Sequence, residues 1–278
     1  MITFNRRAHQ DTGLFEKKVS AESSESSDHE VGGKRPNRQT CICIVFDGHG
    51  QADNVVAITA RKIAEQNLDL PVKELVAKIA AETVYPYSGS TMAYFKVEGT
   101  RVQIALLGDS RVVIVRKKGK SMEISFQEEC INLSDPEEQK RVESTGARVS
   151  IVEEVYRMSI GKEGGLPMSR AFGDSRYKAM LPEPCYFTVD VQEGDYVMAF
   201  SDGMTEGKFS MMKEDEIDFM RNGMPSIYGA GVSIEKLVKE FGELIDIYDD
   251  LSLVAECMVH FAIREGSTDD IPFGAVRV

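Results

Sequence analysis

The sequence predicts an α+β sandwich built mainly from antiparallel sheets. Three observations favour it: a pair of amphipathic helix patterns early in the chain, a run of short strands joined by tight turns in the middle, and a second helix pair before the last strand. Hairpin-linked strands form antiparallel sheets, and each helix pair needs an apolar surface to cover, so the helices should pack on the sheets. A chain of 278 residues can bury a full core, and we expect a single domain over residues 1–278.

The first predicted strands form a hairpin, over residues 14–19 and 41–46. The segment that joins them, residues 20–39, is rich in Ser and Glu and then in Gly, Lys, Arg and Pro. With almost no apolar content it is predicted to be a mobile acidic loop. Its serines followed by acidic residues fit phosphorylation sites, and a plain solvated loop explains the same composition.

Apolar residues at helical spacing predict the first helix pair, since Ala52, Val56, Ala60 and Ile63 recur four, four and three positions apart and a second set follows Pro71. The remaining elements follow from apolar runs and Gly-containing turns. They are strands over 91–97, 101–107, 111–116, 196–200 and 274–278, and helices over 234–244 and 251–261.

The overall charge limits the classes of partner. The formal net charge of -12 argues against a nucleic-acid-binding protein, which needs a basic face to meet phosphates. It also disfavours docking on an anionic membrane. Most of this acidity is explained by solubility, and carboxylates gathered around metal ions would add to it. No pattern in the sequence determines an oligomeric state.

The cysteines indicate a reducing compartment. They contain no CxxC pair and no even disulfide framework, so we expect an intracellular protein, cytoplasmic and/or nuclear; they are Cys41, Cys43, Cys130, Cys185 and Cys257. Residues 1–7 lack the apolar core of a signal peptide. No segment approaches the ~20 apolar residues that cross a bilayer.

Four aspartates stand where an apolar segment or a Gly/Ser turn ends. Asp47 follows the apolar run CICIVF and precedes Gly48-His49-Gly50, and Asp109, Asp202 and Asp269 occupy similar contexts. Strand ends can aim such carboxylates at a common point, and oxygen-only ligands suit hard cations such as Mg²⁺ or Mn²⁺. The pattern therefore predicts a metalloenzyme. A calcium-binding structural domain would not explain a histidine between two glycines.

In their order, the motifs of the chain resemble those of the metal-dependent protein serine/threonine phosphatases of the 2C class. The resemblance runs from Arg6 to the C-terminus and implies a four-layer α/β/β/α sandwich with a two-metal site at one end, between the sheets. Residues 148–180 correspond to the flap of that family, in which we interpret Arg170 and Asp174 as structural. The motifs are VFDGHG (45–50), SGSTMA (88–93), LLGDSRVVI (106–114), GGLPMSRAFGD (164–174), AFSDGMTEG (199–207) and GSTDDI (266–271).

The resemblance assigns metal-binding roles residue by residue. Asp47 matches the carboxylate that bridges two metal ions, and Gly48 matches the residue that offers a backbone carbonyl to one of them. Asp202 and Asp269 match the other ligands of the first metal. Asp109 matches an aspartate that holds, with Asp202, a third and weaker ion. The implied cofactors are two Mg²⁺ or Mn²⁺ ions, with this third ion in addition.

Three further residues have implied roles in the reaction. Arg6 matches the arginine that holds the substrate phosphate, His49 matches the proposed general acid, and Asp11 belongs to the acidic N-terminal pair that binds or faces the metals. The implied reaction is hydrolysis of phosphoserine or phosphothreonine in a phosphorylated protein substrate by a metal-activated water. Such a reaction requires no covalent phospho-enzyme.

Gln10 is the departure from the family pattern with the largest consequence. It stands where the family has the glutamate of the N-terminal pair, so the second metal loses a charged neighbour. This leaves an alternative function open: a weak or inactive pseudophosphatase that acts as a regulatory binding module. The retention of Asp47, Asp202 and Asp269 favours the active enzyme.

We predict that Gln10→Glu raises metal affinity and lowers the Mn²⁺ concentration for half-maximal activity. Two unit charges about 4 Å apart interact by about 1 kcal/mol in water and about 4 kcal/mol at an effective dielectric of 20. After desolvation and ordering, a net gain of roughly 1–2 kcal/mol remains, or about tenfold in affinity. Calorimetric titration of both proteins with Mn²⁺ measures the difference. Identical affinities would mean that residue 10 does not face the metal site.

Overall fold

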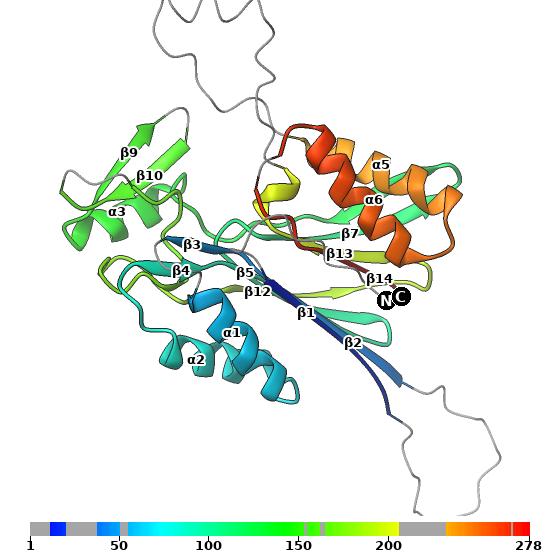
Figure 1. The fold of residues 1–278 in the computed structure, drawn as a ribbon, viewed down its shortest axis with the longest axis horizontal. Helices are drawn as coiled ribbons and strands as arrows, with labels where there is room; N and C mark the ends of the chain where they lie inside the picture. The colour runs from blue at the N-terminus through cyan, green and yellow to red at the C-terminus, as the bar shows by residue number, and fades with distance from the viewer. Residues whose placement is uncertain are drawn as a thin grey trace, which may run out of the picture.

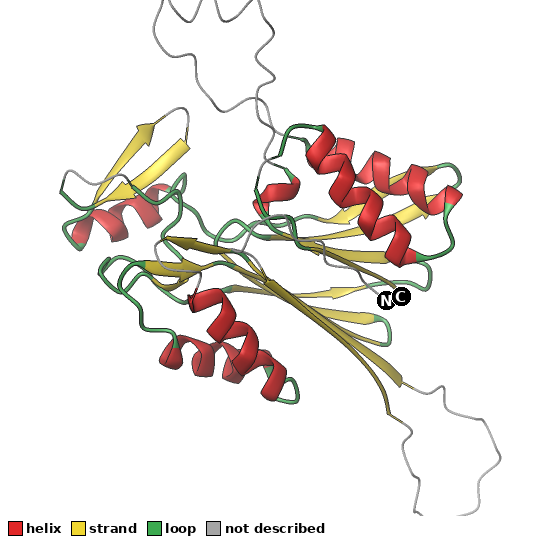
Figure 2. Cartoon of the chain, in the orientation of Figure 1, coloured by secondary structure: helices red, strands yellow, loops and turns green. Residues whose placement is uncertain are grey.

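The structure is a computed structural model of the chain, and it describes residues 12–20, 38–50, 55–152, 155–161, 165–205, 232–267 and 269–278. Within these ranges the chain forms two antiparallel sheets that lie face to face, with a pair of helices on each outer side (Figures 1 and 2). This is the α/β/β/α sandwich that the resemblance implies. No helix in the described ranges is both long enough and apolar enough to cross a membrane.

The first sheet has five strands in the order β1-β2-β5-β6-β12. β1 and β2 form the predicted hairpin, and residues 21–37 of the predicted acidic loop lie outside the described residues. β2 also pairs with β5, so it lies inside the sheet. The strands are β1 (Thr12–Ser20), β2 (Arg38–Phe46), β5 (Met92–Glu98), β6 (Arg101–Leu107) and β12 (Cys185–Asp190).

The second sheet has four strands in the order β14-β13-β7-β8. β6 of the first sheet passes to β7 of the second through the Gly108-Asp109 turn, so the two sheets share a connection at one end. The strands are β7 (Arg111–Lys118), β8 (Ser121–Phe126), β13 (Tyr196–Phe200) and β14 (Phe273–Arg277).

Two helix pairs cover the outer faces (Figure 1). α1 (Val55–Gln66) and α2 (Val72–Glu82) pack on the first sheet, and α5 (Ile234–Ile247) and α6 (Leu251–Arg264) pack on the second. The two later helices begin at side-chain caps, because Ser233 accepts the Lys236 N–H and Asp250 accepts the Ser252 N–H.

The apolar run CICIVF is explained by burial on both faces of β2. Cys41, Cys43 and Val45 face the other sheet and join the cluster between the sheets. Ile42, Ile44 and Phe46 alternate with them and pack against α1 and α2. A strand covered on both sides reads as a continuous apolar segment, because neither face meets water.

Two smaller units lie at the end where the apolar strands stop. A three-stranded sheet in the order β11-β4-β3 consists of β3 (Gly48–Gly50), β4 (Ser88–Ser90) and β11 (Phe172–Gly173). Beside it, α3 (Pro136–Ser144) packs with the hairpin of β9 (Arg148–Val152) and β10 (Val155–Ser159) around a separate apolar cluster. We call this second unit the α3 lobe.

The α3 lobe is fastened to the rest of the fold by Glu138. This carboxylate is buried, with 3% of its side chain exposed, and it accepts hydrogen bonds from Arg141, Ser169 and Arg170. Arg170 lies two residues before β11, so its structural interpretation agrees with these contacts. Burial alone would raise the pKa of Glu138, but the bonds from Arg141, Arg170 and Ser169 outweigh it and lower the pKa to about 2.

We predict that Glu138→Gln lowers the free energy of unfolding, and that the loss depends on pH. Because the folded pKa lies below the unfolded value, the ionised form stabilises the fold above pH 4.5, and this contribution disappears as the pH falls toward 2. The shift corresponds to about 3 kcal/mol at neutral pH and less than half of that near pH 3. Denaturant unfolding of both proteins at pH 7 and pH 3 measures it.

Glu137→Gln on the same helix is the matched control, because Glu137 is 81% exposed and pairs only with Lys140 among the contacts in the described chain. An exposed pair of this kind contributes little to stability. If Glu138→Gln and Glu137→Gln cost the same at pH 7, the Glu138 network does not stabilise the α3 lobe.

Candidate metal centre and active site

Asp47 is placed by the end of β2. The residue follows Phe46 directly, and its backbone carbonyl accepts a hydrogen bond of 2.9 Å from the Thr91 N–H, just before β5. This bond holds the chain at the edge of the first sheet as it turns into β3. The carboxylate therefore leaves the apolar interior where the sheet ends, and its residue is partly buried.

Asp109 and Asp202 reach the same place from turns at the second sheet. Asp109 lies between β6 and β7, after Gly108, whose φ of 78° suits glycine and where a Cβ would lie 2.6 Å from Thr91 Cγ2. Asp202 begins the short 3₁₀ helix Asp202–Met204, which follows β13 after the single residue Ser201. Each carboxylate is thus placed by the first residues beyond a buried strand.

A carboxylate oxygen from each of Asp47, Asp109 and Asp202 lies within 4.8 Å of the others. All three residues are partly buried, and Asp109 Oδ1 is a buried oxygen with no hydrogen-bond partner among the described residues. Three negative groups so close together repel one another unless a cation lies between them. Oxygen ligands and an orphaned buried acceptor fit a hard divalent ion such as Mg²⁺ or Mn²⁺.

The surroundings of Asp109 act on its protonation in opposite directions. Burial raises the pKa of the Asp109 carboxyl, and the nearby charge of Asp269 raises it further. A hydrogen bond from its own backbone N–H to the carboxylate, together with the charges of His49 and Arg111, acts to lower this pKa. Three groups that the sequence predicts to work together, Asp109, Asp269 and His49, therefore lie within electrostatic range of one another.

Asp269 lies beside the cluster without being one of the three residues whose oxygens meet. It follows α6, and its Oδ1 accepts the Asp270 N–H at 2.8 Å. A Cβ built on Gly203 would lie 3.4 Å from the Asp269 Cβ, so Asp269 packs against the turn that carries Asp202. Gly48 belongs to β3, next to Asp47, and its own carbonyl is therefore close to the same end.

Three residues predicted for the site, Arg6, Gln10 and Asp11, lie outside the described residues. Their predicted roles stay predictions.

His49 projects from β3, and its ring has one hydrogen-bond partner among the described residues. Its Nε2 lies 2.6 Å from Oδ2 of Asp174, an almost fully buried aspartate after β11. Its other ring nitrogen, Nδ1, is buried and has no hydrogen-bond partner in the described chain. The sequence interpretation placed Asp174 as a structural residue of the flap, and in the structure its carboxylate contacts His49, the predicted general acid.

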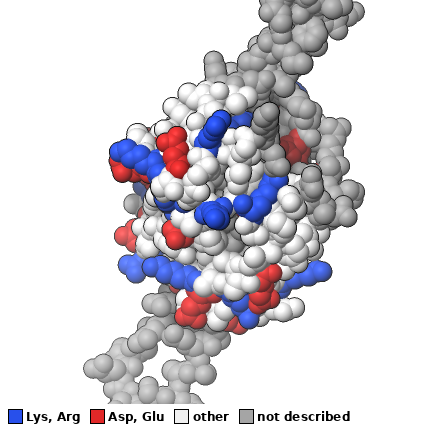
Figure 3. Space-filling model, turned by 90° about the vertical axis from the view of Figure 1, so that its left-hand side faces the viewer, with Lys and Arg blue, Asp and Glu red and all other residues white. Residues whose placement is uncertain are grey.

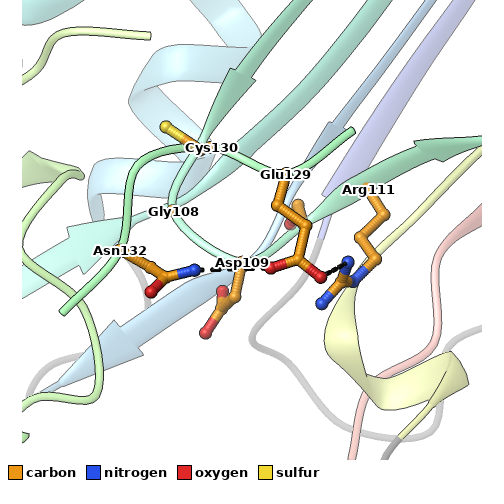
Figure 4. A pocket seen from close by; sticks show the side chains of 7 residues that line it. Gly108, Asp109, Arg111, Glu129, Cys130 and Asn132 are labelled. Atoms are coloured by element: carbon orange, nitrogen blue, oxygen red, sulfur yellow. Dashed lines mark hydrogen bonds and ion pairs between the residues drawn. The ribbon is translucent and has the colours of Figure 1, made fainter. Parts of the chain in front are cut away.

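A small pocket of about 50 Å³ opens beside Asp109 (Figure 4). Arg111 Nη1 donates to Glu129 Oε1 at 2.5 Å across its rim, and Asn132 Nδ2 donates to Glu129 Oε2 at 3.3 Å. Sequence analysis did not single out Glu129 and Asn132, because they follow β8 on an irregular segment without a motif. Arg111 lies in the motif LLGDSRVVI and begins a predicted strand, but it was assigned no role in the site.

The two sheets, the flanking helix pairs and the carboxylate cluster at their shared end define a sandwich protein with a candidate divalent-metal site. The chain belongs to the protein phosphatase 2C family, whose family model matches residues 20–271. Probable protein phosphatase 2C 21 of Oryza sativa subsp. japonica is 24% identical over 249 residues, which are 85% of this chain and 67% of the relative. The chain spans about half of the length of most curated relatives that it matches.

Solved structures show the same fold. A phosphatase from a pathogenic strain of Toxoplasma gondii has a TM-score of 0.63 at 18% identity, and the match covers 97% of this chain and 93% of that chain. The catalytic domain of the serine threonine protein phosphatase PstP, solved in complex with two manganese ions, has a TM-score of 0.50 at 15% identity and coverage of 96% and 99%. At these identities the likeness concerns the fold alone.

We predict that Gly203→Ala weakens Mn²⁺ binding and lowers stability together. A Cβ at this position would collide with the backbone carbonyl oxygen of Asp270, so the Asp269-Asp270 segment must move away from the Asp202 turn. Such overpacking costs about 1–3 kcal/mol of unfolding free energy. Calorimetric titration with Mn²⁺ and denaturant unfolding measure the two effects.

Gly194→Ala is the control for this substitution. Gly194 has a φ of 89° and no atom within 4 Å of a built Cβ, in the turn between β12 and β13. Alanine there should cost stability through the backbone alone and leave Mn²⁺ affinity unchanged. Equal Mn²⁺ affinities for Gly203→Ala and Gly194→Ala would show that the close approach at Gly203 does not shape the metal centre.

Proposed function

We propose that this protein is a metal-dependent protein serine/threonine phosphatase. Membership of the protein phosphatase 2C family supports phosphatase chemistry. The observation that carries the proposal is the convergence of Asp47, Asp109 and Asp202, with a buried oxygen of Asp109 that has no hydrogen-bond partner in the described part of the chain. The two manganese ions named for PstP support Mg²⁺ or Mn²⁺ as the cofactor.

Asp47, Asp109 and Asp202 would hold the ions, together with Asp269 and the carbonyl of Gly48. A pair of divalent ions supplies Lewis-acid activation of water near neutral pH. Arg6 is proposed to bind the phosphoryl oxygens and to neutralise their charge as the bond to the leaving group breaks. His49 is proposed to give a proton to the departing seryl or threonyl oxygen, which is a poor leaving group without one.

A phosphorylated protein is the proposed substrate, and the charge distribution supports it. Several Lys and Arg side chains gather on one face of the molecule (Figure 3), although the chain has a formal net charge of -12. In the α3 lobe and the segment after it, Arg176 and Lys178 line a pocket of about 200 Å³ with Thr145 and Ile160. Positive charge at such a site favours the approach of a phosphorylated, acidic segment.

We also propose that residues 1–278 act as one phosphatase domain in an intracellular setting. All five cysteines are free thiols, which fits a reducing compartment. The alternative function, a pseudophosphatase used as a binding module, is favoured only by Gln10. Retention of the carboxylate cluster favours the enzyme.

We predict that the protein hydrolyses p-nitrophenyl phosphate and a phosphothreonine peptide in the presence of Mn²⁺, and that Asp202→Asn removes this activity. Loss of one carboxylate from the cluster should weaken metal binding and lower kcat/KM by at least about 100-fold. Asp190→Asn is the matched control, because Asp190 is 86% exposed at the end of β12 and contacts Arg101. Steady-state assays with and without Mn²⁺ measure the effect.

An inactive parent protein that still binds Mn²⁺ would favour the pseudophosphatase. Activity of Asp202→Asn within about threefold of Asp190→Asn would remove Asp202 from the metal site.

A further inference from the structure

The contact between His49 and Asp174 is built into the fold from three separate segments of the chain. In the small sheet, β4 lies between β3 and β11. Gly89 of β4 pairs with His49 on one side and with Gly173 on the other. His49 and the residue after Gly173, which is Asp174, therefore meet across Gly89.

Gly89 has to be a glycine for this contact to form. A Cβ built on it would fall closer to Asp174 Oδ2 and to His49 Nε2 than real Cβ atoms approach any neighbour. The two side chains thus occupy the space that any larger residue at position 89 would need. Because the SGS motif of β4 leaves this space open, the pairing of imidazole and carboxylate follows from the sheet itself.

Asp174 is held in a conformation that the fold has to impose. It is the only described non-glycine residue with a positive φ, 46°, and 2% of the residue is exposed. Its N–H donates to the Ser88 carbonyl at 2.9 Å, and its carbonyl accepts the Tyr177 N–H at 2.9 Å. A buried carboxylate on a left-handed backbone is unfavourable unless a partner compensates for it, and such positions are concentrated at functional sites.

We propose that Asp174 is a positioning residue that binds Nε2 of His49 and so fixes the orientation of the imidazole ring beside the candidate metal centre. This inference rests on the proposed phosphatase function. In the reaction of the proposed function, a water oxygen forms a bond to phosphorus, the P–O bond to the seryl or threonyl oxygen breaks, and that oxygen takes a proton from the imidazole ring that Asp174 holds in place.

The test is a double-mutant cycle with two substrates of different leaving groups. The proteins are the parent, His49→Gln, Asp174→Asn and the double variant, all full-length and assayed with Mn²⁺. Asparagine tolerates a left-handed backbone better than most residues, so Asp174→Asn should keep the fold. Thermal unfolding of each variant, with Asp190→Asn as the matched surface control, checks this.

Asp174→Asn should lower kcat on the phosphothreonine peptide by about 10- to 100-fold, the usual scale for losing a partner that orients a functional group. KM should change little, and the loss on p-nitrophenyl phosphate should be much smaller, since nitrophenolate leaves without a proton. In the His49→Gln background, Asp174→Asn should cause no further loss on either substrate. Equal losses on both substrates, or a full extra loss in that background, would overturn the proposal.

A second measurement tests the hydrogen bond between His49 and Asp174 without any reaction. Nitrogen-15 spectra of the histidine rings should show the His49 proton on Nε2 in the parent, with a strongly shifted Nε2–H signal that Asp174→Asn removes. If the parent shows this signal but hydrolyses neither substrate, the phosphatase function fails and the proton-transfer role falls with it, while the pairing stands. If the parent is active and the proton is on Nδ1 alone, the positioning role is overturned and the phosphatase function stands.

Discussion

The fold depends on one strand that is buried on both faces. Alternate residues of β2 enter two different apolar clusters, one between the sheets and one under α1 and α2. Burial of each such side chain stabilises the fold by about 1.5–3 kcal/mol, so the strand cannot shift by one residue without exchanging its two faces. The place where β2 stops is therefore fixed, and the first polar residue beyond it, Asp47, is fixed with it.

The same constraint brings the other carboxylates to this end. β6 crosses to β7 through the turn that carries Asp109, and Asp202 lies two residues after the end of β13, so both sheets place an acid at one edge. Packing of apolar strands supplies the free energy that holds these like charges together. Asp109 Oδ1 has no hydrogen-bond partner among the described residues, and a divalent ion would supply one.

The sequence was sufficient to predict elements whose apolar pattern is strong. β13 and the two helix pairs follow directly from such patterns, and their positions agree with the structure. β8 and β12 were not predicted: along each, intermediate and exposed residues alternate, and no residue is fully buried. α3 was not predicted either, because most of its residues are charged. It begins at the cap residue Asp135, and its buried Glu138 pairs with Arg170, a partner that is distant in the sequence.

In the site, too, residues that belong to a local pattern could be predicted, and contacts between distant segments could not. Asp47, Asp109 and Asp202 were predictable because each follows its own strand or turn, and a local pattern was enough to find them. The partner of His49 was not, since β3, β4 and β11 have two or three residues each and exist only through pairing between distant segments. The glycine in SGS and the aspartate in AFGD have no visible relation along the chain.

The fold brings these two motifs together, because Gly89 of SGS lies between His49 and Asp174 of AFGD. Glu138 also acts on this region, because it accepts hydrogen bonds from Ser169 and Arg170, only a few residues before Asp174. The α3 lobe is thereby tied to the same segment that supplies the carboxylate for His49. A buried ion pair can be costly for stability, and its retention is understandable where it fixes a geometry that packing alone would leave loose. In this protein the buried acid pairs of the lobe and of the small sheet hold one continuous segment, residues 169–174, against the end of the sandwich where the carboxylates of Asp47, Asp109 and Asp202 meet.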